Sequence, residues 1–338
     1  MKVKATGPDG DELPLGSLEI SSDQGSYCYD LRATILDPDA AREVLPTADG
    51  VVEIETTVAG WRFDFVVEGY SLTREAGRIE YQVEGRSRTA RLASPHAPPR
   101  TNLVTEDRQA IQLAHQEMDY LDTDVDYQLP NWLVPGGVWG YSDETPMRAL
   151  QRLAEVTGGF VRSHRHRREV QLVPRYPVSP PDWPDADAPA LDVARILQEE
   201  SEWIDDERLA IAWVMGDSAQ GITVRGYRAA WDQYTDGPRT ASPVAYSLVT
   251  EPNPGRAQAR YRIDRSGPKL RSQITATLAD ADEDPDGFRP PGSMVRLIDG
   301  DSSEPALVVG VTVRADGSRA AQQTLDLELR PEESEWRG

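Results

Sequence analysis

The stretch NWLVPGGVWGYSDETPMRALQRLAEVTGGFVRSHRHRREVQLVPRYP, residues 131–177, decides the fold, because several local signals agree within it. Asp143 or Thr145 can cap a helix, and Pro146 suits the first helical turn. Apolar side chains then recur on one helical face, at Met147, Leu150, Leu153 and Ala154. Gly158-Gly159 ends the predicted helix, since glycine readily adopts the left-handed conformation found at helix ends.

Two short strands are predicted after this helix, around the polar tip 163–168. The first contains Phe160-Val161, and the second contains Val170, Leu172 and Val173. The unit is therefore a strand, a helix and a hairpin. Because the regions on both sides of it have strand patterns, the sequence predicts a small α/β module between two β domains.

The region before this module alternates as strands do. Tyr27, Tyr29, Leu31, Ala33 and Ile35 mark one half-buried strand. Residues 51–58 and 61–70 form a predicted hairpin joined at Ala59-Gly60, with Trp61, Phe63, Phe65 and Val67 on one face and Arg62 and Asp64 on the other, wet face. A further strand around 79–83 completes a predicted barrel or sandwich that closes near residue 95.

The remaining chain is divided by prolines. Residues 94–100 (SPHAPPR) form a linker, residues 105–116 a predicted helix and 125–129 a strand. The six prolines of 174–189 predict a stiff extended crossover that is neither sheet nor helix. After it we expect strands at 210–215, 221–226, 273–278, 294–298, 307–314 and 323–328, a helix at 253–266, an acidic loop at 279–287 and a loose tail at 330–338. The predicted domains are 1–95, 96–188 and 189–338.

Composition limits the classes of function. The formal net charge of −21 argues against a surface that grips nucleic acid, but an acidic wall lets a polyanion pass without sticking. No apolar run reaches the ~20 residues of a membrane span, and the first residues lack the apolar core of a signal peptide. The single cysteine, Cys28, allows no intrachain disulfide or cysteine-based zinc site, and we expect it to be packed.

Three sets of residues suggest metal or acid–base chemistry, and each has a simpler interpretation. Asp122, Asp124 and Asp126 resemble the start of a calcium loop, but the sixth and twelfth positions hold Tyr127 and Leu133 instead of glycine and glutamate. His164 and His166 share a strand face, yet four nearby arginines repel a cation. A basic loop that meets an acidic partner or subunit, or a plain solvated turn, is the better interpretation of 162–168.

The acidic runs at 199–200, 205–207 and 280–286 indicate wet surfaces, because acid–base pairs need a fixed spacing and one raised pKa. The motifs G-x-S-x-G, H-E-x-x-H and G-x-x-x-x-G-K-[ST] do not occur. The eight tryptophans are scattered, which argues against a sugar-binding platform. We therefore predict no catalytic, cofactor-binding or metal-binding residues and no cofactor.

Several segments, in order along most of the chain, are similar to the tail-tip (baseplate) hub proteins of long-tailed bacteriophages and gene-transfer particles. They are VEGRSRTARL at 83–92 followed by SPHAPP, the segment 129–161, VQLVPRYPVSPPDW at 170–183, PGSMVRL at 291–297, VVGVTV at 308–313 and QTLDLEL at 323–329. The resemblance implies a mainly β fold with an α+β insertion, in which two tail-tube-like β-barrel domains are separated by the small α/β module.

The resemblance also implies a structural role in the virion. Three copies would form a homotrimeric ring that joins the sixfold tail tube or distal-tail ring to a threefold central fibre or spike. The tape-measure protein would be a further partner, DNA would pass through without sequence-specific binding, and assembly would occur in the host cytoplasm. Alternatives are a hub of a contractile or Mu-like injection particle, a secreted glycan-degrading enzyme and a carbohydrate-binding β protein.

Overall fold

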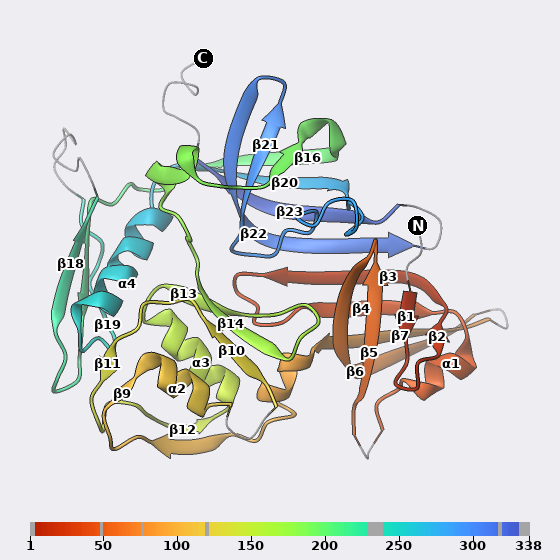
Figure 1. Ribbon diagram of the computed structural model, residues 1–338, viewed down its shortest axis with the longest axis horizontal. Coiled ribbons are helices and arrows are strands. Elements are labelled where there is room, and N and C mark those ends of the chain that lie inside the picture. The colour runs from red at the N-terminus through yellow and green to blue at the C-terminus, as the bar shows by residue number, and fades with distance from the viewer. Residues whose placement is uncertain are drawn as a thin grey trace.

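The computed structural model describes residues 4–47, 50–75, 78–118, 122–228, 239–316 and 320–330. One large antiparallel sheet dominates it, and smaller mixed α/β layers lie beside the sheet (Figure 1). The N-terminal part of the large sheet comprises β1 (Lys4–Thr6), β2 (Glu12–Leu13), β3 (Leu15–Asp23), β4 (Asp30–Ile35), β5 (Val52–Val58), β6 (Trp61–Glu75) and β7 (Arg78–Ser87), with the short helix α1 (Pro38–Glu43) between β4 and β5.

The predicted hairpin is present as β5 and β6, with Val58 opposite Trp61. Ala59 and Gly60 form its turn with φ values of 47° and 76°, the left-handed geometry that matches the twist of a two-residue hairpin. Behind this turn lies the predicted acidic loop, because the Ala281 amide donates to the Ala59 carbonyl over 2.9 Å. The first and last parts of the chain therefore meet here.

The C-terminal strands continue the same sheet. They are β15 (Ala190–Asp192), β16 (Ile196–Ile204), β20 (Lys269–Thr277), β21 (Met294–Asp299), β22 (Ser302–Asp316) and β23 (Gln322–Leu329), with the 3-10 helix η3 (Val193–Arg195) before β16. β22 pairs antiparallel with β3, which places Thr312 opposite Ser21. The main path through the sheet is β16-β20-β23-β22-β3-β4-β7-β6-β5-β1-β2.

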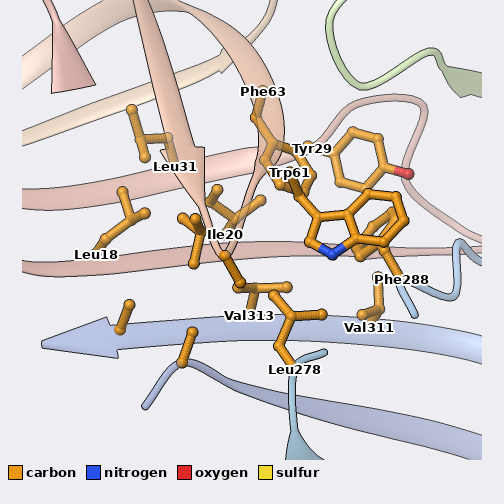
Figure 2. Close-up of a cluster of buried hydrophobic side chains, with 14 of the residues drawn as sticks. Leu18, Ile20, Tyr29, Leu31, Trp61, Phe63, Leu278, Phe288, Val311 and Val313 are labelled. Carbon is orange, nitrogen blue, oxygen red and sulfur yellow. The ribbon is translucent and has the colours of Figure 1, made fainter. Parts of the chain in front are cut away.

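One apolar core serves both ends of the chain (Figure 2). Leu18 and Ile20 from β3 lie in it beside Val311 and Val313 from β22. Phe288 packs edge-on against Phe63 with their ring centroids 5.3 Å apart. Alternation along β3 and β22 puts Leu18, Ile20, Val311 and Val313 on one face, and the pairing of the two strands makes that face continuous across residues about 290 positions apart.

The 131–177 stretch folds as predicted. Thr145 caps α3 (Pro146–Glu155) by accepting from the Arg148 amide, whereas Asp143 has a φ of 60° and does not cap it. Gly158 follows the helix with a φ of 73°, and a Cβ there would lie 2.3 Å from Tyr261. The hairpin is β13 (Gly159–Ser163) with β14 (Glu169–Pro174). The other elements of the module are the η1 turn (Arg88–Leu92), β8 (Arg100–Leu103), β9 (Arg108–Gln109), α2 (Ala110–Gln116), β10 (Asp124–Tyr127), β11 (Leu133–Val134) and β12 (Gly140–Glu144).

Residues after the proline-rich crossover add a second α/β layer to this module. β17 (Ile211–Met215), β18 (Thr223–Tyr227) and β19 (Val244–Ala245) form a three-stranded sheet covered by α4 (Pro252–Arg265). Val214, Leu248 and Ile263 belong to the same apolar cluster as Leu150 and Leu172 of the module. The helix expected at 253–266 is thus confirmed, and it packs with the module and not with the large sheet.

Several local predictions need correction. The helix expected at 105–116 begins only at Ala110, because Arg108–Gln109 pairs with β11. The crossover 174–189 contains the 3-10 helix η2 (Pro180–Asp185), which buries Trp183. The nine-residue strand β16 was not expected at all. The domain limits at 95/96 and 188/189 stay a prediction, and most of the tail predicted at 330–338 lies outside the described residues.

Candidate assembly surfaces

The large sheet has one apolar face and one polar face. On the polar face, cross-strand register aligns Arg314, Glu19, Arg32 and Glu84 as a ladder of alternating charge. Arg314 lies 2.7 Å from Glu19, and Arg32 lies 3.4 Å from Glu84. Shallow hollows of about 420 and 460 Å³ open on this face and are lined mostly by charged and hydroxyl side chains. Exposed ion pairs of this kind add little stability. This face of the sheet is open to solvent.

The basic loop 163–168 docks on this chain's own acidic residues. The Asp64 amide donates to the Arg165 carbonyl over 2.9 Å, and the Arg165 guanidinium lies 4.9 Å from the centre of the Trp61 ring. Arg168 reaches Glu53 at 3.2 Å. The loop is therefore not a plain solvated turn, because it fixes the module to the hairpin β5–β6, and its contact with another subunit stays a prediction.

The hairpin carries a buried carboxylate at this junction. The Asp64 side chain is only 1% exposed, although its alternation with Phe63 and Phe65 predicted a wet position. Arg62 donates to both of its oxygens at 3.0 and 3.1 Å, and Arg88 lies 2.5 Å away. Two arginines thus offset the large cost of taking a carboxylate out of water. We call this cluster of Glu53, Asp64, Arg62, Arg88 and Arg168 the acidic junction.

His164 and His166 lie in the same loop with their rings 4.6 Å apart. Burial, strengthened by the neighbouring Arg167 and other cations, lowers the pKa of His164 to about 4. The described residues contain no group of three potential metal ligands. His164 Nδ1 accepts from the backbone amides of His166 and Arg167 at 3.3 and 3.1 Å, so this ring helps to shape the loop.

The other candidate residues are dispersed. Asp122 is exposed beside Arg168, whereas Asp126 accepts hydrogen bonds from Gln128 and Gln171 within a sheet. Cys28 is buried, and its burial raises the pKa of its thiol to about 12, which makes it a packed side chain and a poor nucleophile. The acidic loop 280–286 packs on the β5–β6 turn, far along the chain from the acidic strand β16.

One buried polar cluster escaped sequence analysis. Glu117 accepts from the Tyr141 hydroxyl at 2.7 Å and pairs with Arg100. Burial raises the pKa of this carboxyl, although Tyr141 and Arg100 oppose the shift. Glu117 is the residue that caps the C-terminal end of α2, Tyr141 lies in β12 and Arg100 in β8, so no local spacing could have joined them. No helix among the described residues is long and apolar enough to cross a membrane.

Comparisons with known proteins agree with this architecture. No protein-family model matches the chain, and no curated protein is found as a relative. Solved structures do match along nearly the whole chain. A tail protein from Neisseria meningitidis is similar with a TM-score of 0.67 and 15% identity, covering 99% of this chain and 97% of its own. A 43 kDa tail protein of prophage MuSo2 from Shewanella oneidensis gives a TM-score of 0.62 and 14% identity, covering 97% and 98%.

A type VI secretion component from E. coli, described as similar to the T4 bacteriophage tail proteins gp27 and gp5, gives a TM-score of 0.56 at 14% identity and covers 98% of this chain and 78% of its own. At such low identity these likenesses establish the fold and not the activity. The resemblance to bacteriophage tail proteins predicted from the sequence is confirmed at that level. The chain has the fold of phage tail and type VI baseplate proteins.

Proposed function

We propose that this protein is the structural hub of a phage-like tail tip. Three copies form a ring that caps the sixfold tail tube or distal-tail ring and narrows to a threefold central fibre or spike. Each copy contributes two tube-like β regions, and the ring surrounds the channel through which the genome leaves. The tape-measure protein contacts it during assembly in the host cytoplasm, and the mature location is the tail tip of the virion.

The single observation that carries this proposal is the continuous sheet that joins β1–β7 to β16 and β20–β23, in a fold shared with tail proteins over nearly its full length. Three copies with two β regions each place six β regions around the ring, which gives the ring an approximate sixfold symmetry. The polar face of the sheet suits the wall of such a ring, because its hydroxyl, acidic and ion-paired side chains offer a polyanion no adhesive surface. The wall needs no catalytic residue.

A hub of a contractile or Mu-like injection particle is the second candidate. It is favoured by the similarity to the prophage MuSo2 tail protein and to the type VI secretion component. The two candidates share the ring and differ in the surrounding tail. Genes for a sheath beside the gene for this chain, or a sheath seen on the particle, would select the contractile form.

The decisive experiment measures the oligomeric state of the chain and the symmetry of the particle tip, and it examines the particles of a deletion strain. The purified chain should be a trimer by light scattering at micromolar concentration, and the particle tip should show threefold symmetry where it meets a sixfold tube. Deletion of the gene should give particles without tail tips or without tails. Intact, normal tips in the deletion strain would refute the hub proposal.

A further inference from the structure

Strand β16 has no counterpart among the other long strands of the sheet, because none of its nine residues is buried. Among the residues that the structure describes it pairs only with β20, and these residues leave the backbone donors and acceptors of its other edge without a paired strand. Two large apolar side chains on it are exposed, Leu197 at 58% and Trp203 at 41%. Exposed strand edges with apolar residues invite association. The strand therefore has the features of a surface that another molecule covers.

The acidic residues of β16 restrict what can cover it. Glu199, Glu200 and Glu202 follow one another within four positions. Among the described residues none of the three carboxylates forms an ion pair: Glu199 accepts from Ser201 and Ser272, Glu200 accepts from Gln198, and Glu202 lies opposite Arg271 of β20 in register without a salt bridge to it. Three negative charges so close together repel an acidic strand, and a neutral strand would cover them without a cationic partner, so the matching surface should supply arginine or lysine together with apolar groups.

Such a surface exists elsewhere on the same chain. On the outer face of β17 and β18, Arg225 lies between two aromatic rings, with its guanidinium carbon 4.9 Å from the centre of the Trp213 ring and 4.5 Å from that of Tyr227. Register places Trp213 opposite Arg225, and Met215 continues the same face. Tyr227 is 45% and Met215 37% exposed. We call Trp213, Met215, Arg225 and Tyr227 the arginine patch.

The arginine patch lies on the face of its sheet that is opposite α4. α4 covers the opposite face of the sheet, where Ala212 and Val214 are buried and where a Cβ on Gly226 would meet Ala259 at 2.7 Å. Figure 1 shows α4 between β18 and the body of the molecule. Within the described part of the chain the Arg225 guanidinium makes ring contacts only, without a carboxylate partner.

The stacking decides between two kinds of ligand. A sugar-binding platform requires an open ring face, whereas the Arg225 guanidinium occupies a face of both rings. A stacked guanidinium keeps the donors along its edge available, and these donors match a carboxylate in a bidentate arrangement. Arginine, tryptophan, tyrosine and methionine are also the residues enriched in protein interfaces. The patch therefore fits an acidic protein surface that carries apolar side chains.

We infer that β16 of one copy docks by its outer edge on the arginine patch of the next copy, with Glu202 opposite Arg225 and Trp203 beside the aromatic rings. Successive side chains of a strand point to opposite faces, so Glu202 and Trp203 both flank the edge that meets the patch. The two surfaces differ and lie on one chain, so the contact is heterologous and can close into a ring. This inference rests on the proposed ring of three and adds which surfaces join its members. It also explains why a strand without buried residues is kept in the sheet.

A charge exchange tests the inference in the full-length protein. In Glu202→Arg and in Arg225→Glu, the contact brings like charges together, and the concentration at which half of the chains are trimeric should rise at least about tenfold. The double variant restores opposite charges and should return this concentration to within about threefold of the wild type. Unchanged circular dichroism and unfolding midpoints verify that each variant is folded. Glu43→Arg, on α1, serves as a control that leaves assembly unchanged.

Cross-linking gives an independent measurement, because the only natural thiol, Cys28, is buried. Ser201→Cys chains mixed with Met215→Cys chains and treated with a short bismaleimide should give covalent dimers, because Ser201 is exposed and adjoins Glu202. Each variant alone, and a mixture of Glu43→Cys with Met215→Cys, should not. Trimers that persist in both charge variants without cross-links overturn the inference and leave the ring intact. A wild-type chain that stays monomeric at every concentration overturns both proposals.

Discussion

Two acidic regions of this molecule have opposite properties. At the acidic junction, Asp64 is buried and Glu53 is mostly covered, and arginines from three different segments surround them. Along β16, three glutamates are exposed and lack a cationic partner among the described residues. A buried carboxylate must be neutralised within its own chain, whereas an exposed one costs little until something covers it. The comparison separates charges that hold the fold from charges available for assembly.

The largest effect is expected for Asp64→Ala. The change leaves Arg88 beside a cavity and removes the partner of Arg62, so the free energy of unfolding should fall by about 3–5 kcal/mol. Urea unfolding monitored by circular dichroism measures it. The matched control is Glu55→Ala, because Glu55 pairs with the same Arg62 at 2.8 Å but is 38% exposed, and it should cost less than about 1 kcal/mol. Equal losses in the two variants would remove the distinction between the regions.

A smaller loss is expected for Glu53→Gln. Glu53 lies 2.8 Å from Arg88, 2.9 Å from Arg91 and 3.2 Å from Arg168, and the amide keeps the shape but loses the charge. We expect a loss of about 2 kcal/mol, the scale of a hydrogen bond to a charged group. Since Arg168 belongs to the docked loop, limited proteolysis should also cut the segment 163–168 faster. A stable variant with an unchanged digestion pattern would show that the loop is held by Asp64 and Trp61 alone.

Glu68 is partly buried and so lies between the two acidic regions, and its effect is measured through the pH dependence of stability. Burial alone would raise the pKa of Glu68, but hydrogen bonds from Arg86 at 2.6 Å and His96 at 2.5 Å outweigh it, so the pKa lies below its ordinary value of 4.5. A lowered carboxylate pKa stabilises the fold above the unfolded-state value, and this stabilisation is lost as the pH falls through the folded-state value.

The wild type should therefore lose stability as the pH falls below about 5, by up to about 1.4 kcal/mol per pH unit for this one proton. Glu68→Gln should show a shallower slope over that range, and exposed Glu84→Gln should keep the wild-type slope. Parallel curves for the wild type and Glu68→Gln would mean that Arg86 and His96 do not favour the charged carboxylate in the folded state.

The same comparison explains what could be predicted from sequence. The hairpin β5–β6 and helix α3 follow from local rules, because alternation, a capping threonine and a terminal glycine act within a few residues. Asp64 pairs with Arg88 of η1, and the loop 163–168, about 100 positions later, docks on the same strand, so the alternation of Asp64 with Phe63 and Phe65 indicated the wrong environment. Strand β16 has no apolar alternation, because none of its residues is buried, and only its pairing with β20 reveals it.

The assembly surfaces were hidden for the same reason. Arg225, Trp213 and Tyr227 are spaced as ordinary members of two short strands, and only cross-strand register brings them together. The resemblance to tail proteins predicted a ring but assigned no residue to its interfaces. A carboxylate that is paired within the folded chain and a carboxylate that is exposed look alike in a sequence. They differ only in whether an arginine lies close to them in the folded structure.

The smallest effect is expected for Glu202→Gln. Its carboxylate is exposed and has no partner among the described residues, so the unfolding free energy of the dissociated chain should change by less than about 0.5 kcal/mol. Urea unfolding at a concentration where the chain is monomeric measures this value, and the trimer should still be weakened at higher concentration. A loss above about 1 kcal/mol in the monomer would mean that β16 uses its charges to hold its own subunit together. In that case the glutamates of β16 would stabilise the folded monomer, as the carboxylates of the acidic junction do. Exposure alone would then not identify the charges that serve assembly.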